Sequence, residues 1–150
     1  MNIIKSFFKI SAQSNVSSIA LLAVRLVVGV AFVIHGWEKI LDPFGWMSPW
    51  SQVPGFFQFL AALSQFGGGI ALITGLLTRL ASLGLFITMA YAYVFHITQG
   101  HPFIAVGGKP SYEIAAFYTA VSFMFLLIGP GRFSIDAKVF GITLNGGNGR

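Results

Sequence analysis

The chain contains no cysteine among its 150 residues and few charged side chains, with 9 Lys and Arg against 4 Asp and Glu. The absence of cysteine excludes disulfides, thiolate nucleophiles and cysteine-ligated iron–sulfur clusters. The sequence also lacks a phosphate-binding loop, a nucleophile elbow and an HExxH pattern, and so contains no self-contained catalytic motif. Any electrons that the protein handles must therefore be carried by a bound quinone, flavin or haem, or by a partner protein.

The scarcity of charge also excludes a soluble domain. Only 9% of the residues are charged, against about 25% in a typical soluble domain, and 55% are hydrophobic. So few polar side chains cannot cover the surface of a water-soluble globule. A lipid bilayer is the solvent that suits this composition, and the formal net charge of +5 is interpreted as membrane topology. We expect no nucleic-acid partner.

Long apolar stretches predict the transmembrane segments. Each is long enough to cross a bilayer as a helix, and a helix satisfies its own backbone hydrogen bonds. The last ends at Gly129-Pro130-Gly131, a strong helix stop. The predicted fold class is an all-α membrane protein, a four-transmembrane-helix bundle. Its expected helices span residues 16–41, 56–77, 80–98 and 112–128.

The flanking basic residues predict the orientation. On one side of the predicted spans lie Lys5, Lys9, Arg79, Arg132, Lys138 and Arg150, and on the other side lie only Lys39 and Lys109. Cytoplasmic flanks carry the excess of Lys and Arg, so both termini are expected in the cytoplasm.

The ends of the chain are predicted to lie outside the transmembrane domain of residues 16–140. Residues 1–15 read as a cytoplasmic amphipathic segment, since Ile3, Ile4, Phe7 and Phe8 share one helical face. A cleavable signal peptide is the alternative, disfavoured because Arg25 interrupts its apolar core. Residues 141–150 are expected to form a flexible tail.

Several polar residues fall at a similar depth in the outer half of the predicted bundle. They are His35, Glu38, Lys39, Gln65, His96, His101, Tyr112 and Glu113. One interpretation is structural: Lys39 pairs with Glu113 or Asp42 and fixes the helix register. The other is a polar pocket for an amphipathic molecule such as a quinone, in which His35 or His96 donates hydrogen bonds.

Two other ligands are weaker hypotheses. Haem held by His35 and His96 has no further support in the sequence. A metal site from His96 and His101 is disfavoured because a spacing of five residues does not place both rings on one helix face, and no metal site is expected.

The first helix carries a stripe of Arg25, Gly29, Phe32 and Gly36. Arg25 either snorkels to the inner headgroups or forms a buried pair, and the glycines allow close helix packing. In the second helix, Gly67, Ala71 and Gly75 predict another packing face.

These features resemble the DoxX family of small bacterial inner-membrane proteins. The resemblance rests on RLVVGVAFVIHGWEK (25–39), QFGGGIALITGLLTR (65–79), His96 with Gly100, Tyr112-Glu113, and GPGRFSID (129–136), whose acidic residue is Asp136. It covers nearly the whole chain. One departure is Gln65, where the family usually has glutamate, so a binding role at this position is favoured over a proton relay.

The resemblance implies a four-helix bacterial inner-membrane protein associated with oxidoreductases, some relatives being linked to quinone-reducing complexes. The leading hypothesis is a quinone-interacting or redox-partner subunit. Two alternatives stay open: a small-solute transporter acting as a homodimer through the small-residue face, and a non-catalytic scaffold that docks soluble redox enzymes.

Overall fold

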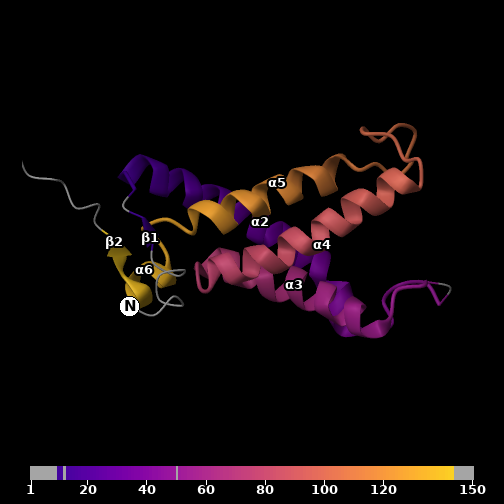
Figure 1. Ribbon diagram of the computed structural model, residues 1–150, viewed down its shortest axis with the longest axis horizontal. Helices are drawn as coiled ribbons and strands as arrows, with labels where there is room; N and C mark the ends of the chain where they lie inside the picture. Colours follow the sequence, from indigo (N-terminus) through magenta and orange to yellow (C-terminus); the bar gives the residue numbers. More distant parts are fainter. Residues whose placement is uncertain (1–9, 12, 50, 144–150) are drawn as a thin grey trace, which may run out of the picture.

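The computed structural model describes residues 10–11, 13–49 and 51–143 (Figure 1). In this part of the chain the structure is all-α apart from a two-residue strand pair. The elements in order are β1 (Ile10–Ser11), α2 (Asn15–Leu41), α3 (Gly55–Thr74), α4 (Thr78–Thr98), α5 (Glu113–Ile128), α6 (Ile135–Phe140) and β2 (Ile142–Thr143). By length and composition α2, α3 and α4 can each cross a membrane, and α5 is a shorter apolar helix of 16 residues.

The helix boundaries follow from local chemistry. α2 begins after Ser14, whose side chain accepts a hydrogen bond from the Ser17 N–H at 3.1 Å. α3 ends at Thr74, because Gly75 adopts a left-handed conformation with φ +69° and its N–H bonds the Ala71 carbonyl. The expectation that this helix continues to residue 77 is therefore wrong.

Three short elements were absent from the prediction: α6, β2 and β1, the last within the segment of residues 1–15 that was expected to be amphipathic. α6 begins after Ser134, whose hydroxyl accepts a hydrogen bond from the Ala137 N–H at 3.1 Å. β2 pairs in parallel with β1, so the first residues of the predicted C-terminal tail belong to a strand. Residues 144–150, and the amphipathic face predicted around residues 3–8, lie outside the described residues.

Consecutive helices pack against one another, α2 on α3, α3 on α4 and α4 on α5. The chain therefore runs back and forth along one axis (Figure 1). At the end of the bundle called here the α6 end lie the start of α2, the α3–α4 turn, α6 and the strands. The opposite end, called the loop end, holds the loops of residues 42–54 and 99–112.

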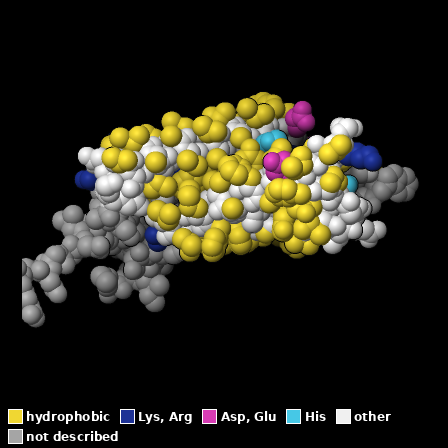
Figure 2. Space-filling view, turned by 90° about the horizontal axis from the view of Figure 1, so that it is seen from above, with side chains coloured by type: hydrophobic (Ala, Val, Ile, Leu, Met, Phe, Trp, Pro, Cys, Tyr) yellow, Lys and Arg dark blue, Asp and Glu magenta, His cyan; other side chains and the backbone are white. Residues whose placement is uncertain are grey.

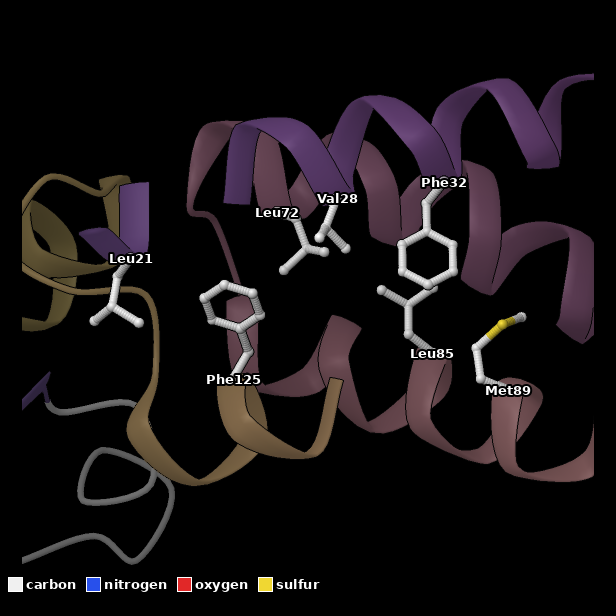
Figure 3. Packing of buried hydrophobic residues seen from close by; sticks show 7 residues of the cluster. All are labelled: Leu21, Val28, Phe32, Leu72, Leu85, Met89 and Phe125. Carbon is white, nitrogen blue, oxygen red and sulfur yellow. The ribbon is translucent and has the colours of Figure 1, made fainter. Parts of the chain in front are cut away.

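The buried apolar cluster lies between the helices and the outer surface is apolar as well. Figure 3 shows the side chains that fill the interior: Leu21, Val28, Phe32, Leu72, Leu85, Met89 and Phe125. On the outside of α2, Val27 is 72% and Ile34 67% exposed. Hydrophobic side chains also cover most of the face in Figure 2, with Lys and Arg toward its two ends. Such a surface suits lipid rather than water.

Glycines set the close contact between α2 and α3. A Cβ at Gly36 would lie 2.4 Å from the Phe66 backbone nitrogen, and one at Gly69 would lie 2.7 Å from the Gly29 carbonyl oxygen. By contrast, a Cβ at Gly67 would meet only Leu63 of its own helix, at 3.5 Å. The close interhelical approach therefore runs along Gly29, Gly36 and Gly69. Gly75 is the C-cap of α3 and Gly67 does not meet α2, so the predicted stripe of Gly67, Ala71 and Gly75 is not the α2–α3 contact; as a homodimer face it stays a prediction.

Candidate functional site

At the loop end, the predicted polar residues fall into separate groups. The first joins α2 to α3: the Lys39 ammonium donates to Gln65 Oε1 at 2.7 Å and lies 4.6 Å from the centre of the Trp46 ring. Gln65 is only 3% exposed, so this bond satisfies a buried amide oxygen. Lys39 thus bonds Gln65 instead of Glu113 or Asp42, and the ion-pair interpretation is corrected. Glu38, Asp42 and Glu113 are exposed.

Gln58, which sequence reasoning missed, organises the loop beside this group. Its side chain accepts from the Met47 N–H at 3.0 Å and donates to the Val53 carbonyl at 2.9 Å. The Trp46 indole N–H donates to the Gln58 backbone carbonyl at 3.0 Å. The loop that carries Trp46 is therefore folded back onto α3. The sequence does contain a signal for this role: a glutamine one turn into an otherwise apolar helix, whose amide needs hydrogen-bond partners.

The second group lies between α2 and α5. The His35 ring meets the Tyr118 ring edge-on at 6.2 Å, and Phe32 packs against the same tyrosine at 4.7 Å. Tyr118 also borders a groove of about 500 Å³, lined by Phe103, Glu113, Ile114, Ala116, Phe117 and Tyr118. His35 is exposed, and neither its ring nor the Tyr118 hydroxyl has a hydrogen bond within the described residues. Tyr118 was missed, although a phenol within an apolar helix needs a partner.

The third group joins the end of α4 to the following loop. His96 Nδ1 and His101 Nδ1 lie 2.8 Å apart, within hydrogen-bonding distance. The sequence argument that these rings cannot meet is wrong, because α4 ends at Thr98 and the chain turns back before His101. Tyr112 packs against Tyr93 and Phe103, at centroid distances of 5.6 and 5.3 Å. None of these contacts joins His96 to Lys39 or His35. The polar residues that were predicted at a similar depth therefore lie at the same end of the bundle but do not form a single cluster.

The α6 end contains a buried cation. Arg25 is 1% exposed, and its guanidinium donates to four backbone carbonyls: Leu72 at 2.7 Å, Pro130 at 2.8 Å, Phe133 at 3.0 Å and Ile73 at 3.2 Å. The first and last of these belong to the final turn of α3, where helix carbonyls lack intrahelical partners. Arg25 therefore caps α3 and ties α2 to the segment after α5. The prediction that Arg25 is buried is therefore confirmed. The alternative, that its side chain extends to the lipid headgroups, is wrong.

Asp136 provides the matching anion at this end. It is 2% exposed, and its carboxylate accepts from the backbone N–H groups of Leu77 at 2.7 Å and Thr78 at 2.9 Å, at the start of α4. A carboxylate is favoured there because the N-terminus of a helix carries partial positive charge. Asp136 also interacts electrostatically with Arg25. Asp136 therefore caps the N-terminus of α4 and places a negative charge near the buried Arg25.

We expect Asp136→Asn to lower the free energy of unfolding by about 2–3 kcal/mol, because the amide removes the charge and points an N–H group at a backbone donor. Glu38→Gln, at an exposed position of α2, is the matched control and should unfold like the unmodified protein. Chemical unfolding in mild detergent, followed by circular dichroism, measures both. Equal stability of the two variants would contradict the capping role.

Known proteins are similar in sequence to this chain over most of its length. The DoxX family model matches residues 20–97, which is more than half of the chain. The chain belongs to the DoxX family. An Escherichia coli K12 relative, named inner membrane protein YqjF, is 31% identical over 128 residues, covering 83% of this chain and 95% of the relative. A Haemophilus influenzae relative described as an uncharacterized protein is 36% identical over 121 residues, covering 77% and 87%. No solved structure matches the chain.

The DoxX match covers most of α2, all of α3 and almost all of α4. It therefore contains Arg25, Lys39, Gln65 and His96, but not α5 or α6. In this DoxX protein, the matched helices supply the guanidinium and two of the carbonyls at the α6 end, and the segment after α5 supplies the other two carbonyls.

Proposed function

We propose that this DoxX protein is an inner-membrane subunit of an oxidoreductase that binds the headgroup of a quinone between α2 and α5 at the loop end. The observation that carries the proposal is the His35–Tyr118 pair beside an apolar groove. A ligand that lies partly in lipid needs an apolar surface for its ring and a few hydrogen-bond donors for its carbonyl oxygens. The groove provides the first. Tyr118, which lines the groove, and His35, which lies beside the Tyr118 ring but outside the groove lining, provide the second.

The placement of His35 in the membrane supports this assignment. It lies six residues before the end of α2, about 9 Å along the helix axis. An imidazole at this depth, without a protein partner in the described part of the chain, loses hydrogen bonds that water would otherwise supply. Lys39 and His96 are less suited to the role, since each bonds another side chain. Of the hydrogen-bond donors expected from the sequence, His35 is therefore the one proposed to bind the quinone.

In this proposal α5 crosses the membrane as well as α2, α3 and α4. α5 has 16 residues and a length of about 24 Å, and it runs along α4 from the loop end to the α6 end (Figure 1). Arg79, Arg132 and Lys138 belong to the α6 end, whereas Lys39 and Lys109 belong to the loop end. The excess of basic residues favours a cytoplasmic α6 end and cytoplasmic termini. Electrons would then reach the quinone from a partner enzyme, because the chain, without cysteine, has no thiol or cysteine-ligated iron–sulfur carrier of its own.

Quinone binding is testable on the purified protein. We expect a short-chain ubiquinone or menaquinone analogue to bind saturably in mild detergent, and His35→Ala to weaken binding about tenfold, the cost of one lost hydrogen bond. Tyr118→Phe, which removes only the hydroxyl, should act in the same direction. Binding is followed by quenching of tryptophan fluorescence.

The control is His96→Ala, which removes an imidazole at the same end of the bundle that contacts His101 instead of the groove residue Tyr118. It should bind the analogue like the unmodified protein. The absence of saturable binding, or equal losses in the His35 and His96 variants, would refute the assignment of this groove.

A further inference from the structure

The close pair His96 and His101 has no part in the proposed quinone groove. Their Nδ1 atoms lie 2.8 Å apart and their ring centroids 5.0 Å apart, with the planes inclined by 43°. Both side chains are half-buried. Within this pair one Nδ1 donates and the other accepts, so a single proton lies between two nitrogen atoms that face each other.

The backbone holds the two rings in this position. α4 ends at Thr98, and Gly100 then adopts φ +72°, a conformation that glycine enters without strain. The His101 N–H donates to the His96 carbonyl at 3.1 Å, and the Gly100 N–H donates to the Ile97 carbonyl at 2.9 Å. These bonds close the turn and return His101 to the end of the helix. The pair is therefore formed by the fold, not by chance contact of two mobile side chains.

The separation of the two nitrogen atoms is that of an N–H···N hydrogen bond, and it is also short enough for both atoms to bind one metal ion. With metal–nitrogen bonds of about 2.0–2.1 Å, two imidazoles at a right angle have their nitrogens about 2.8–3.0 Å apart, and two in a tetrahedral site about 3.3–3.4 Å apart. The 2.8 Å separation of the hydrogen-bonded pair is closer to the right-angled than to the tetrahedral arrangement, so the smaller adjustment on binding leads to the right angle. Right-angled nitrogen ligands are typical of square-planar or tetragonal Cu²⁺ and Ni²⁺.

We propose that His96 and His101 form a two-histidine site for a square-planar divalent cation, Cu²⁺ or Ni²⁺, at the loop end. Both Nδ1 atoms bind the ion, and water completes its coordination. The proton between the rings moves to Nε2 of the ring that carried it, so binding of the ion to the neutral pair releases no net proton. The negative end of the α4 dipole lies beside the site and favours a cation.

The surroundings give the ion access from solvent. His101 borders a hollow of about 560 Å³, whose lining includes Gly100, Pro102 and Lys109. This space admits water or a small anion to the remaining coordination positions. The Lys109 ammonium is the charged group of the hollow; its charge opposes a bare cation and favours an anionic co-ligand such as chloride.

Copper titration of the full-length protein tests this site. The protein is purified in mild detergent with a tag that contains no histidine, and Cu²⁺ is added while electron paramagnetic resonance and tryptophan fluorescence are recorded. We expect one ion per chain and an axial spectrum with nitrogen couplings. His96→Ala and His101→Ala should each weaken binding about 100-fold, the loss of a chelate. His35→Ala, at the remaining histidine, should leave it unchanged.

Substitution of two glycines distinguishes binding of the ion by both histidines from binding by a single imidazole. Gly100 and Gly107 both have positive φ, and an added Cβ would meet nothing within 4 Å at either. Gly100→Ala should weaken copper binding because it strains the turn between the two histidines, whereas Gly107→Ala should not. Copper affinity that is equal in the unmodified protein and in either single histidine variant would show a hydrogen-bonded pair only and overturn the proposal. The quinone titration does not depend on this outcome.

Discussion

Arg25→Met is expected to lower the free energy of unfolding by about 3–5 kcal/mol, the range for removing one partner of a buried charged network. The methionine fills much of the space, but four backbone carbonyls lose their donor and Asp136 loses its neighbouring cation. Two of the carbonyls belong to the last turn of α3, so this helix end also loses its cap. Chemical unfolding in mild detergent, followed by circular dichroism, measures the change.

Two further variants define the origin of this loss. Arg25→Lys keeps the charge but replaces a planar fork of donors with one ammonium, so it should recover only part of the stability. Arg132→Met removes an exposed arginine that bonds Asn15 at 3.0 Å and should change stability by less than about 0.5 kcal/mol. If Arg25→Met unfolded like Arg132→Met, the buried network would contribute nothing to folding.

Gly36→Ala is expected to cost about 1–2 kcal/mol net, because overpacking outweighs the better helix propensity of alanine. The added Cβ would lie 2.4 Å from the backbone nitrogen and 2.8 Å from the Cα of Phe66. Backbone atoms cannot rotate away as a side chain can, so α2 and α3 must move apart. The Lys39–Gln65 bond lies close to this contact and should weaken with it.

Gly67→Ala is the matched control, on the same pair of helices. Its Cβ would meet only Leu63 Cδ1, at the ordinary contact distance of 3.5 Å, so the helix-propensity gain of up to about 1 kcal/mol should remain. The two substitutions are thus expected to have opposite signs in the same unfolding assay. Destabilisation by Gly67→Ala alone would restore the stripe of small residues that the sequence suggested.

Hydropathy located the helices well because their lengths are set by the bilayer. The predicted segment 112–128 differs from α5 by one residue, and 16–41 from α2 by one residue. The sequence did not reveal the end of α3 at Thr74, since Leu76 and Leu77 continue the apolar run while the backbone has already turned at Gly75. Hydropathy shows which residues prefer lipid to water. It does not show where the backbone turns, because the turn depends on the left-handed conformation of Gly75.

The polar groups were harder to place than the helices. Position along a helix gives depth, so His35, Lys39 and His96 were correctly expected near one end. Which of them meet depends on how each helix is rotated about its axis and on which helices are neighbours. The partners of Arg25 could not be predicted from residue types, because they are main-chain carbonyls, which every residue has. Two chain reversals bring these carbonyls together.

The Arg25 network also constrains the order in which the protein can be completed during synthesis. Arg25 enters the membrane with the first long helix, and the carbonyls of Leu72 and Ile73 follow with the second. The carbonyls of Pro130 and Phe133 and the carboxylate of Asp136 are translated more than 100 residues after Arg25. Arg25 therefore keeps unsatisfied donors until residues 130–133 have been made, and a nascent chain that stops before this segment carries an incompletely satisfied arginine in the membrane.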